Sequence, residues 1–221
     1  MTESSTPRIP LAMKVVFTAF MAVLVPFYWN AYGPTNFLYF CDVSLFFTLA
    51  ALWTEKPILA SIPAVGIVVP QMLWVLDFVL GMVGLHPLGM TDYMFRDSIP
   101  LFARGLSLFH GWLPFLLLWL VKRLGYDKRA LWMWTAVGWS LMLIGYFFLP
   151  APPAPVSSPN LPVNVDYVFG PSDTHVQTWM PAPVYLLAMM IGLFAIMWWP
   201  AHRVLSRLTP AGVSAARVRG L

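Results

Sequence analysis

The chain has 221 residues, of which 59% are hydrophobic and only 10% are charged. A soluble domain carries roughly 25% charged residues, so the composition excludes an ordinary soluble protein and indicates a chain that lies largely in lipid. The net charge of +4 does not indicate a nucleic-acid partner, because the basic residues are confined to short loops and the C-terminal tail, where they orient a membrane protein.

Six stretches are apolar enough to cross a membrane, a task that takes roughly 20 residues. In chain order they are 11–29, 36–53, 57–83, 98–121, 130–149 and 183–201. The third contains Pro63 and Pro70, which predict a kink or a tilt. We therefore expect an all-α membrane protein, with a single six-transmembrane-helix domain over 1–205 and a basic cytoplasmic tail over 206–221.

The basic residues alternate between the two sides of this arrangement. All but Arg96 and Arg104 of the 13 basic residues fall near the start of the first stretch, after the second, after the fourth or after the sixth. They are Arg8, Lys14, Lys56, Lys122, Arg123, Lys128, Arg129, Arg203, Arg207, Arg217 and Arg219. Because basic loops remain in the cytoplasm, we expect both termini to be cytoplasmic. We expect the protein to lie in the inner or plasma membrane of the cell.

Two long loops are then expected on the outer side, at 84–97 and 150–182. Their polar residues include His86, Asp92, Arg96, Asp97, Asn160, Asn164, Asp166, Tyr167, Asp173 and His175. Loops of this length in a compact domain are often functional. An ordered cap or a flexible spacer is an equally good interpretation.

Ionisable residues inside a span are costly and usually face the interior of the bundle. At about 1.5 Å per residue, Asp42, Asp77 and Arg104 lie roughly 8–9 Å below the outer ends of their helices, and His110 lies roughly 18 Å below. Arg104 and His110 are about 120° apart around their helix, with Ser107 midway between them. Gly105 and Gly111 allow close approach, and Pro114 favours a kink below His110.

Nucleophilic catalysis is one hypothesis for this layer. Cys41 would be the nucleophile, His110 the general base, and Asp42 a group that orients the imidazole. Asp77, Arg104, Ser107, Asn164 and Tyr167 would bind the substrate, with Arg104 suited to an oxyanion or a lipid phosphate. Against this, a single membrane cysteine is more often a packing residue. Asp42, Asp77 and Arg104 could equally form a buried ion-pair network that joins three helices.

Metal and cofactor chemistry is poorly supported by the sequence. His86, His110 and His175 could supply metal ligands together with outer carboxylates, but no tight histidine spacing occurs. The phosphate-binding glycine loop, the dinucleotide fingerprint and the Gly-x-Ser-x-Gly elbow are also missing from the sequence. We therefore expect no cofactor and no metal, and no nucleotide-driven chemistry.

Four segments resemble a known family. They are Asn-Phe-Leu-Tyr-Phe-Cys-Asp-Val-Ser-Leu at 36–45, Leu-Phe-His-Gly-Trp-Leu-Pro-Phe at 108–115, Asn-Val-Asp-Tyr-Val-Phe-Gly at 164–170 and Trp-Met-Pro-Ala-Pro-Val-Tyr at 179–185. In order and spacing they resemble the bacterial YwaF-type integral membrane proteins and their transmembrane acyltransferase relatives. More distantly they resemble the androgen-induced transmembrane hydrolases of fatty-acid esters. The resemblance implies six helices, a nucleophile early in the second helix, at Cys41, and a histidine in the fourth, at His110.

The sequence departs from this family at positions that matter. Tyr39 and Phe40 stand where the family often has a histidine, and a charged Asp42 beside Cys41 would oppose formation of the thiolate. The first hypothesis is thus a lipid-processing enzyme, an acyl-ester hydrolase or acyltransferase that acts on a membrane lipid or fatty-acyl substrate. The alternatives are a non-enzymatic carrier or binding protein for a small molecule or ion, using Asp42, Asp77 and Arg104, or a structural membrane subunit.

Overall fold

The computed structural model of the chain describes residues 9–208, and these residues form helices and loops without any strand. Arg8, Arg217 and Arg219, and most of the expected tail, lie outside the described residues. The helical elements in chain order are α1 (Leu11–Tyr32), η1 (Pro34–Leu38), α2 (Phe40–Thr54), α3 (Pro57–Gly81), η2 (Asp92–Phe95), α4 (Leu101–Ser107), α5 (Phe109–Leu124), α6 (Ala130–Phe148), η3 (Val165–Tyr167), α7 (Ala182–Gly192), η4 (Leu193–Trp198) and α8 (Trp199–Leu208).

The all-helical class is confirmed for the described residues, and five candidate membrane spans support a membrane protein, whereas the count of six spans is not confirmed. Five helical segments within 9–208 are long and apolar enough to cross a membrane: α1, α3, α4 with α5, α6, and the run from α7 to α8. The sixth candidate, α2, has only 15 residues, which corresponds to about 22 Å of helix. That is shorter than the roughly 30 Å hydrocarbon core of a bilayer.

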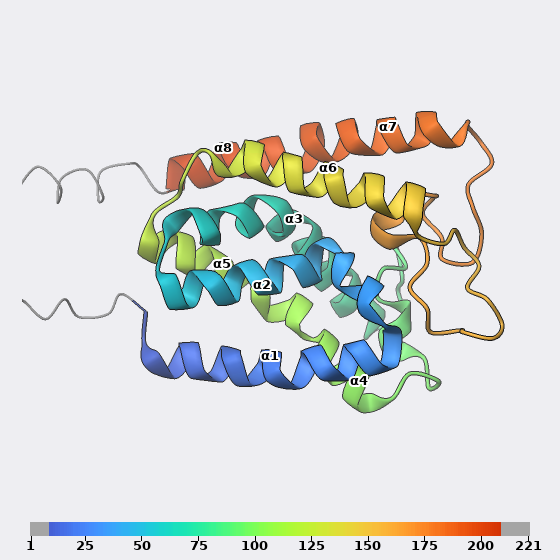
Figure 1. Cartoon of the computed structure of the whole chain (residues 1–221), viewed down its shortest axis with the longest axis horizontal. Coiled ribbons are helices and arrows are strands. Elements are labelled where there is room, and N and C mark those ends of the chain that lie inside the picture. The colour runs from blue at the N-terminus through green and yellow to red at the C-terminus, as the bar shows by residue number, and fades with distance from the viewer. Residues whose placement is uncertain (1–8, 209–221) are drawn as a thin grey trace, which may run out of the picture.

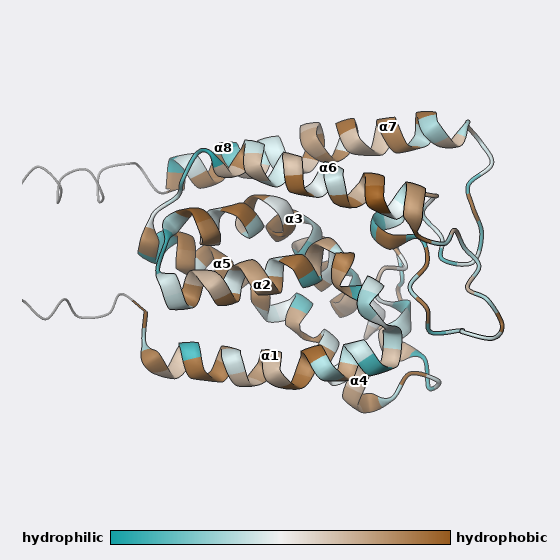
Figure 2. Ribbon diagram, viewed as in Figure 1, coloured by the Kyte–Doolittle hydropathy of each residue, from teal (hydrophilic) through white to brown (hydrophobic). Residues whose placement is uncertain are grey.

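The helices lie side by side with alternating direction, and α3 is the central one (Figure 1). Of the residues in an 18-residue apolar stretch of α3, 56% are buried within the protein, against 22% in the corresponding stretch of α1. Apolar residues dominate the helices, and polar residues gather in the connections at both ends (Figure 2). We call the end that carries residues 82–100 and 149–181 the loop end, and the end that carries Lys56 and residues 125–129 the basic end.

The expected fourth helix is broken. α4 ends at Ser107 and α5 begins at Phe109, so the interruption falls at Leu108 rather than at Pro114, which lies buried inside α5. At the break, the Leu108 N–H bonds to the Gly105 carbonyl and the Gly111 N–H bonds to the Leu108 carbonyl. These hydrogen bonds join residues three apart, in place of the bonds between residues four apart in an α-helix. They leave the Ser107 carbonyl without its helical partner.

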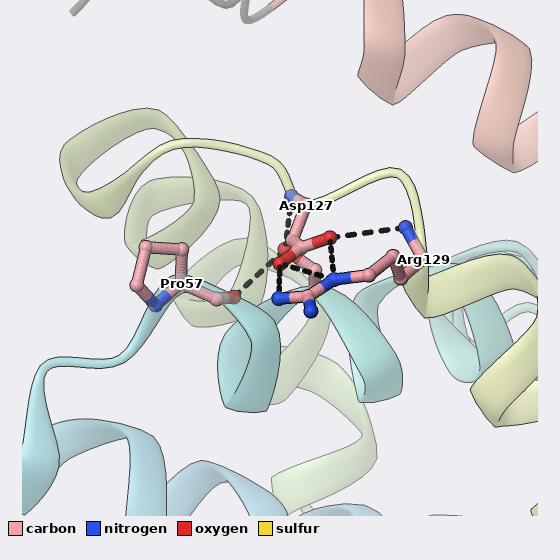
Figure 3. A network of polar contacts seen from close by, with 4 residues as sticks. Pro57, Asp127 and Arg129 are labelled. Atoms are coloured by element: carbon pink, nitrogen blue, oxygen red, sulfur yellow. Dashed lines mark hydrogen bonds and ion pairs between the residues drawn. The ribbon is translucent and has the colours of Figure 1, made fainter. Parts of the chain in front are cut away.

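At the basic end a polar network joins the start of α3 to the turn before α6 (Figure 3). The Ser61 hydroxyl donates to the Pro57 carbonyl and accepts the backbone N–H of Asp127. The Arg129 guanidinium donates to both carboxylate oxygens of Asp127, and this bond lowers the pKa of Asp127 below its usual range. The Asp127 carboxylate is therefore already engaged by Arg129.

Candidate functional site

A cluster of polar side chains is buried at the loop end, where the first turn of α2 meets residues 149–181. Asp42 is only 3% exposed and Asp166 only 8% exposed. We call these two side chains the carboxyl pair. Asp166 accepts the N–H of Phe40, two residues before Asp42 in the first turn of α2, so both carboxyls lie at the start of this helix although 124 residues separate them in sequence.

Asp42 uses one of its two oxygens. Its Oδ2 accepts the Asn36 side-chain amide at 3.3 Å and the Cys41 thiol at 3.7 Å. Its Oδ1 is buried and has no hydrogen-bond partner. The residue also lies in the first turn of α2, where the helix dipole stabilises a negative charge. Asp42 thus retains one unused acceptor inside the protein.

Asp166 caps α2 from outside that helix. Its Oδ1 accepts the Phe40 N–H, the first N–H of α2, at 3.1 Å, while its buried Oδ2 has no partner. Burial raises the pKa of Asp166 well above its usual range; the Phe40 N–H lowers it, and the charge of Asp42 raises it further. Asp166 was not among the predicted site residues, because no local spacing connects it to α2. The available signals were its place in the long outer loop, between the candidates Asn164 and Tyr167, and the resemblance that joins 164–170 with 36–45.

The backbone that presents Asp166 is strained. Asn164, Asp166 and Tyr167 have φ values of 52°, 56° and 60°, in the left-handed region that residues other than glycine rarely adopt. Such conformations persist only where the surroundings enforce them, and they cluster at functional sites. Here the enforcement comes from the Asn164 side chain.

Asn164 is 1% exposed and bonds to the loop itself rather than facing an open site. Its amide donates to the carbonyls of Gly170 at 2.8 Å and Ser172 at 3.0 Å, and its oxygen accepts the Phe169 N–H at 2.8 Å. These bonds engage both ends of the amide. Asn164 thus has a structural role in the loop, and substrate binding by Asn164 stays a prediction. Tyr167, which follows Asp166 in sequence, is 36% exposed.

Hydroxyl groups surround the carboxyl pair on the other side. The Tyr28 hydroxyl of α1 and the Ser107 hydroxyl of α4 lie 3.0 Å apart, and Tyr28 is within electrostatic range of Asp42 and Cys41. Tyr93 from η2 lies near Ser107, and burial raises the pKa of Tyr93 above its usual range. Ser107 is thus a junction between α1, α4 and η2, next to the carboxyl pair.

Asp77 and Arg104 do not form the expected ion pair. Asp77 accepts the backbone N–H of Leu88 and both the N–H and the hydroxyl of Thr91, each at 2.9 Å. Arg104 donates to the Met94 carbonyl at 3.1 Å. Both side chains hold residues 84–97 against the bundle, so this segment is an ordered cap over the polar cluster.

His110 forms its hydrogen bond with the backbone at the helix break and not with Cys41. Its Nδ1 lies 2.8 Å from the Ser107 carbonyl. A carbonyl can only accept, so Nδ1 carries the proton and His110 satisfies the group that the break leaves without its helical partner. The imidazole ring stacks on Trp74 and Phe109, with centroids 5.2 and 4.0 Å away.

The Cys41 thiol and the His110 imidazole are consequently not joined. The thiol donates to Asp42 and the imidazole to Ser107, and no hydrogen bond connects Cys41 with His110 in the described chain. The structure brings together Cys41, Asp42, Ser107 and Tyr167 with Asp166, and assigns Asp77, Arg104 and Asn164 to loop anchoring. Within residues 9–208, no group of three or more His, Cys, Asp or Glu side chains is arranged to hold a metal ion.

One role of the carboxyl pair is helix capping, since Asp166 Oδ1 accepts the first N–H of α2. Capping does not account for Asp42 Oδ1 and Asp166 Oδ2, which are buried carboxyl oxygens without a hydrogen-bond partner. Comparison with models of known families, with characterised proteins and with solved structures found no match to this chain.

Proposed function

We propose that the chain is a membrane protein that binds a proton or a small monovalent cation between Asp42 and Asp166, as a non-enzymatic binding protein or carrier. The observation that carries this proposal is the pair of buried, unpartnered carboxylate oxygens, one on Asp42 and one on Asp166, at the start of α2. Two charges of one sign cannot both be buried without a counter-charge. No described Lys or Arg bonds to either carboxyl, so a proton or an entering cation supplies the compensation.

The surroundings also suit a small cation. The Asn36 amide oxygen and the hydroxyls of Tyr28 and Tyr167 are neutral oxygens near the pair, and hard cations prefer oxygen ligands. The carrier alternative drawn from the sequence used Asp42 with Asp77 and Arg104. Since those last two side chains anchor the cap, Asp166 takes their place.

The topology that we propose for this function has six spans and cytoplasmic termini. The described helices alternate in direction, so the start of α1 and the end of α8 lie at the same end of the bundle (Figure 1). Lys14, Lys56, Lys128 and Arg203 gather at that basic end, which supports its placement in the cytoplasm of a cell with this protein in its inner or plasma membrane. The carboxyl pair then faces the outer half of the bilayer.

Cation binding is tested on the purified full chain in neutral detergent, by the shift in thermal unfolding with lithium, sodium, potassium or ammonium chloride. We expect one of these to stabilise the wild type and choline chloride to have no effect. Asp42→Asn and Asp166→Asn should each weaken binding more than about tenfold, because each removes one of the two negative charges that attract the cation, and a loss of about 1.4 kcal/mol is already tenfold. Binding should strengthen as pH rises, because the cation must displace the proton that the raised pKa of Asp166 retains.

Asp97→Asn is the matched control, because Asp97 is an exposed carboxylate of the same loop end. It removes the same charge and should leave cation binding unchanged. Cation stabilisation of equal size in wild type and in both carboxyl variants, or no cation effect at any pH, would contradict the proposal.

A lipid-processing enzyme is the second candidate, favoured by the hydrogen bond from the Cys41 thiol to Asp42. In this version Asp42 accepts the thiol proton in place of His110, the sulfur attacks an acyl ester, and the proton leaves with the alcohol. Water or a second alcohol then takes the acyl group from Cys41. The family resemblance of 36–45 and 108–115 supports this proposal, with a fatty-acyl lipid as substrate.

A thiol-reactive probe with a lipid tail tests it. Labelling of Cys41 should be faster in the folded protein than in the denatured one, and Asp42→Asn should slow it by at least about a hundredfold, the lower range for general-base catalysis. The conservative variant His110→Gln should leave the rate unchanged, since His110 does not contact the thiol. Equal labelling of folded and denatured protein would rule out an activated cysteine.

A further inference from the structure

A groove of about 350 Å³ lies at the basic end, between α8 and the turn that precedes α6. It is lined by Lys128, Trp199, His202, Arg203, Ser206 and Arg207. None of its lining side chains is acidic. The elements that form the groove lie at the opposite end of the bundle from the carboxyl pair (Figure 1).

The cations of the groove have no acidic partner among residues 9–208. Lys128, Arg203 and Arg207 form no ion pair with any described residue. The neighbouring carboxylate, Asp127, is engaged by Arg129 (Figure 3). Three positive side chains in one concave surface repel one another unless an anion occupies it.

A hydrogen bond joins the two sides of the groove. The Tyr126 hydroxyl bonds to His202 Nδ1 at 2.7 Å and fixes the turn against α8. Lys128 and Arg203 both lie close enough to act electrostatically on His202. The Ser206 hydroxyl is buried, lines the groove and has no hydrogen-bond partner, so it offers a donor to an oxyanion.

The faces of α8 point to the source of that anion. Arg203 and Arg207 are one turn apart on one face, while Val204 and Leu208, 55% and 67% exposed, are one turn apart on the adjoining face. Trp199 stands at the start of α8, 41% exposed, with Arg203 over its ring. Tryptophan and arginine beside exposed apolar residues at the end of a span are typical of a helix end in the headgroup region of a bilayer.

We propose that this groove binds the phosphate of an anionic phospholipid. Arg203, Arg207 and Lys128 surround the phosphate, the Ser206 hydroxyl donates to one of its oxygens, and the acyl chains lie along Val204 and Leu208. The proposal does not depend on the carboxyl pair.

Binding is measured on the purified full chain in neutral detergent, by thermal unfolding with added short-chain phosphatidylglycerol, short-chain phosphatidylcholine or inorganic phosphate. Phosphatidylglycerol should stabilise the wild type well above phosphatidylcholine. Each neutralised cation should weaken this binding about fivefold, from roughly 1 kcal/mol per basic residue near an anionic surface. Arg203→Gln with Arg207→Gln should therefore weaken it by roughly thirtyfold.

Lys122→Gln is the matched control, because Lys122 is an exposed cation of the same end that does not line the groove. It should leave lipid binding unchanged, and all variants should elute as the wild type does in size-exclusion chromatography. Equal losses in Lys122→Gln would show general membrane electrostatics and overturn the site. Inorganic phosphate that stabilises as strongly as the lipid would overturn the lipid as its occupant.

Discussion

Replacing Gly66 with alanine is expected to destabilise the protein more than any other single methyl addition at a described glycine. Gly66 lies in the buried part of α3, and a β-carbon there would overlap the indole ring of Trp134 from α6. Trp134 is fully buried and is held edge-on by Phe40 and Trp198, with ring centroids 5.7 and 6.2 Å away. The ring therefore cannot swing aside without displacing two further aromatic residues.

The expected cost is about 3 kcal/mol, the upper part of the range for overpacking a well-packed core. Thermal unfolding in detergent, followed by tryptophan fluorescence, measures it. Gly105→Ala is the control, because Gly105 lies in α4 with nothing within 4 Å of an added β-carbon, and alanine there should leave stability unchanged or raise it by up to about 1 kcal/mol.

A second variant separates steric overlap from other causes. Trp134→Phe in the Gly66→Ala background removes part of the indole and should recover some of the lost stability, since the two positions share one contact. Wild-type unfolding of Gly66→Ala would contradict the close approach of α3 and α6. So would the lack of any recovery in the double variant.

This close approach illustrates which parts of the fold a sequence reveals. Hydropathy located the long helical segments, because burial in lipid requires an unbroken apolar run, although the last one continues to Leu208 rather than ending at 201. The short helices η2 and η3 lie in segments that were predicted only as loops. The sequence did not indicate that Gly66 faces Trp134, since packing partners depend on how the helices turn about their axes. Nor did it indicate the break at Leu108, because the obvious signal, Pro114, is accommodated inside α5.

The polar layer shows the same division. Depth along the helices correctly drew attention to Asp42, Asp77, Arg104 and His110, which all have buried or half-buried polar roles. Their partners come mainly from loops and backbone groups, such as Thr91 for Asp77 and Met94 for Arg104. A loop residue 124 positions away from Asp42 completes the carboxyl pair, and no local spacing predicts that contact.

Asn164 is the residue on which that long-range contact depends, and its replacement provides the second large expected effect. Asn164→Ala removes three short side-chain bonds and leaves the Phe169 N–H and the Gly170 carbonyl unpaired. Each unpaired buried group costs about 1–3 kcal/mol, and alanine at a φ of 52° adds roughly 1 kcal/mol of backbone strain. The loop that holds Asp166 against Phe40 should then open.

Hydrogen exchange measures this opening residue by residue. In Asn164→Ala, the amides of Phe169 and Phe40 should both lose protection, the first because its acceptor is gone and the second because Asp166 no longer caps α2. Cation binding at the carboxyl pair should fall with them, whereas Asn160→Ala, an exposed asparagine of the same loop, should change neither.

Asn164→Gly divides the effect into its two causes. Glycine removes the same side-chain bonds but adopts a positive φ without strain, so it should lose about 1 kcal/mol less than alanine. Protection at Phe40 should nevertheless fall in the glycine variant too, since it is the amide that fixes the position of Asp166. If Phe40 stayed protected while Phe169 exchanged freely, Asp166 would be held by contacts other than the Asn164 side chain, and the link between the strained loop and the carboxyl pair would be wrong.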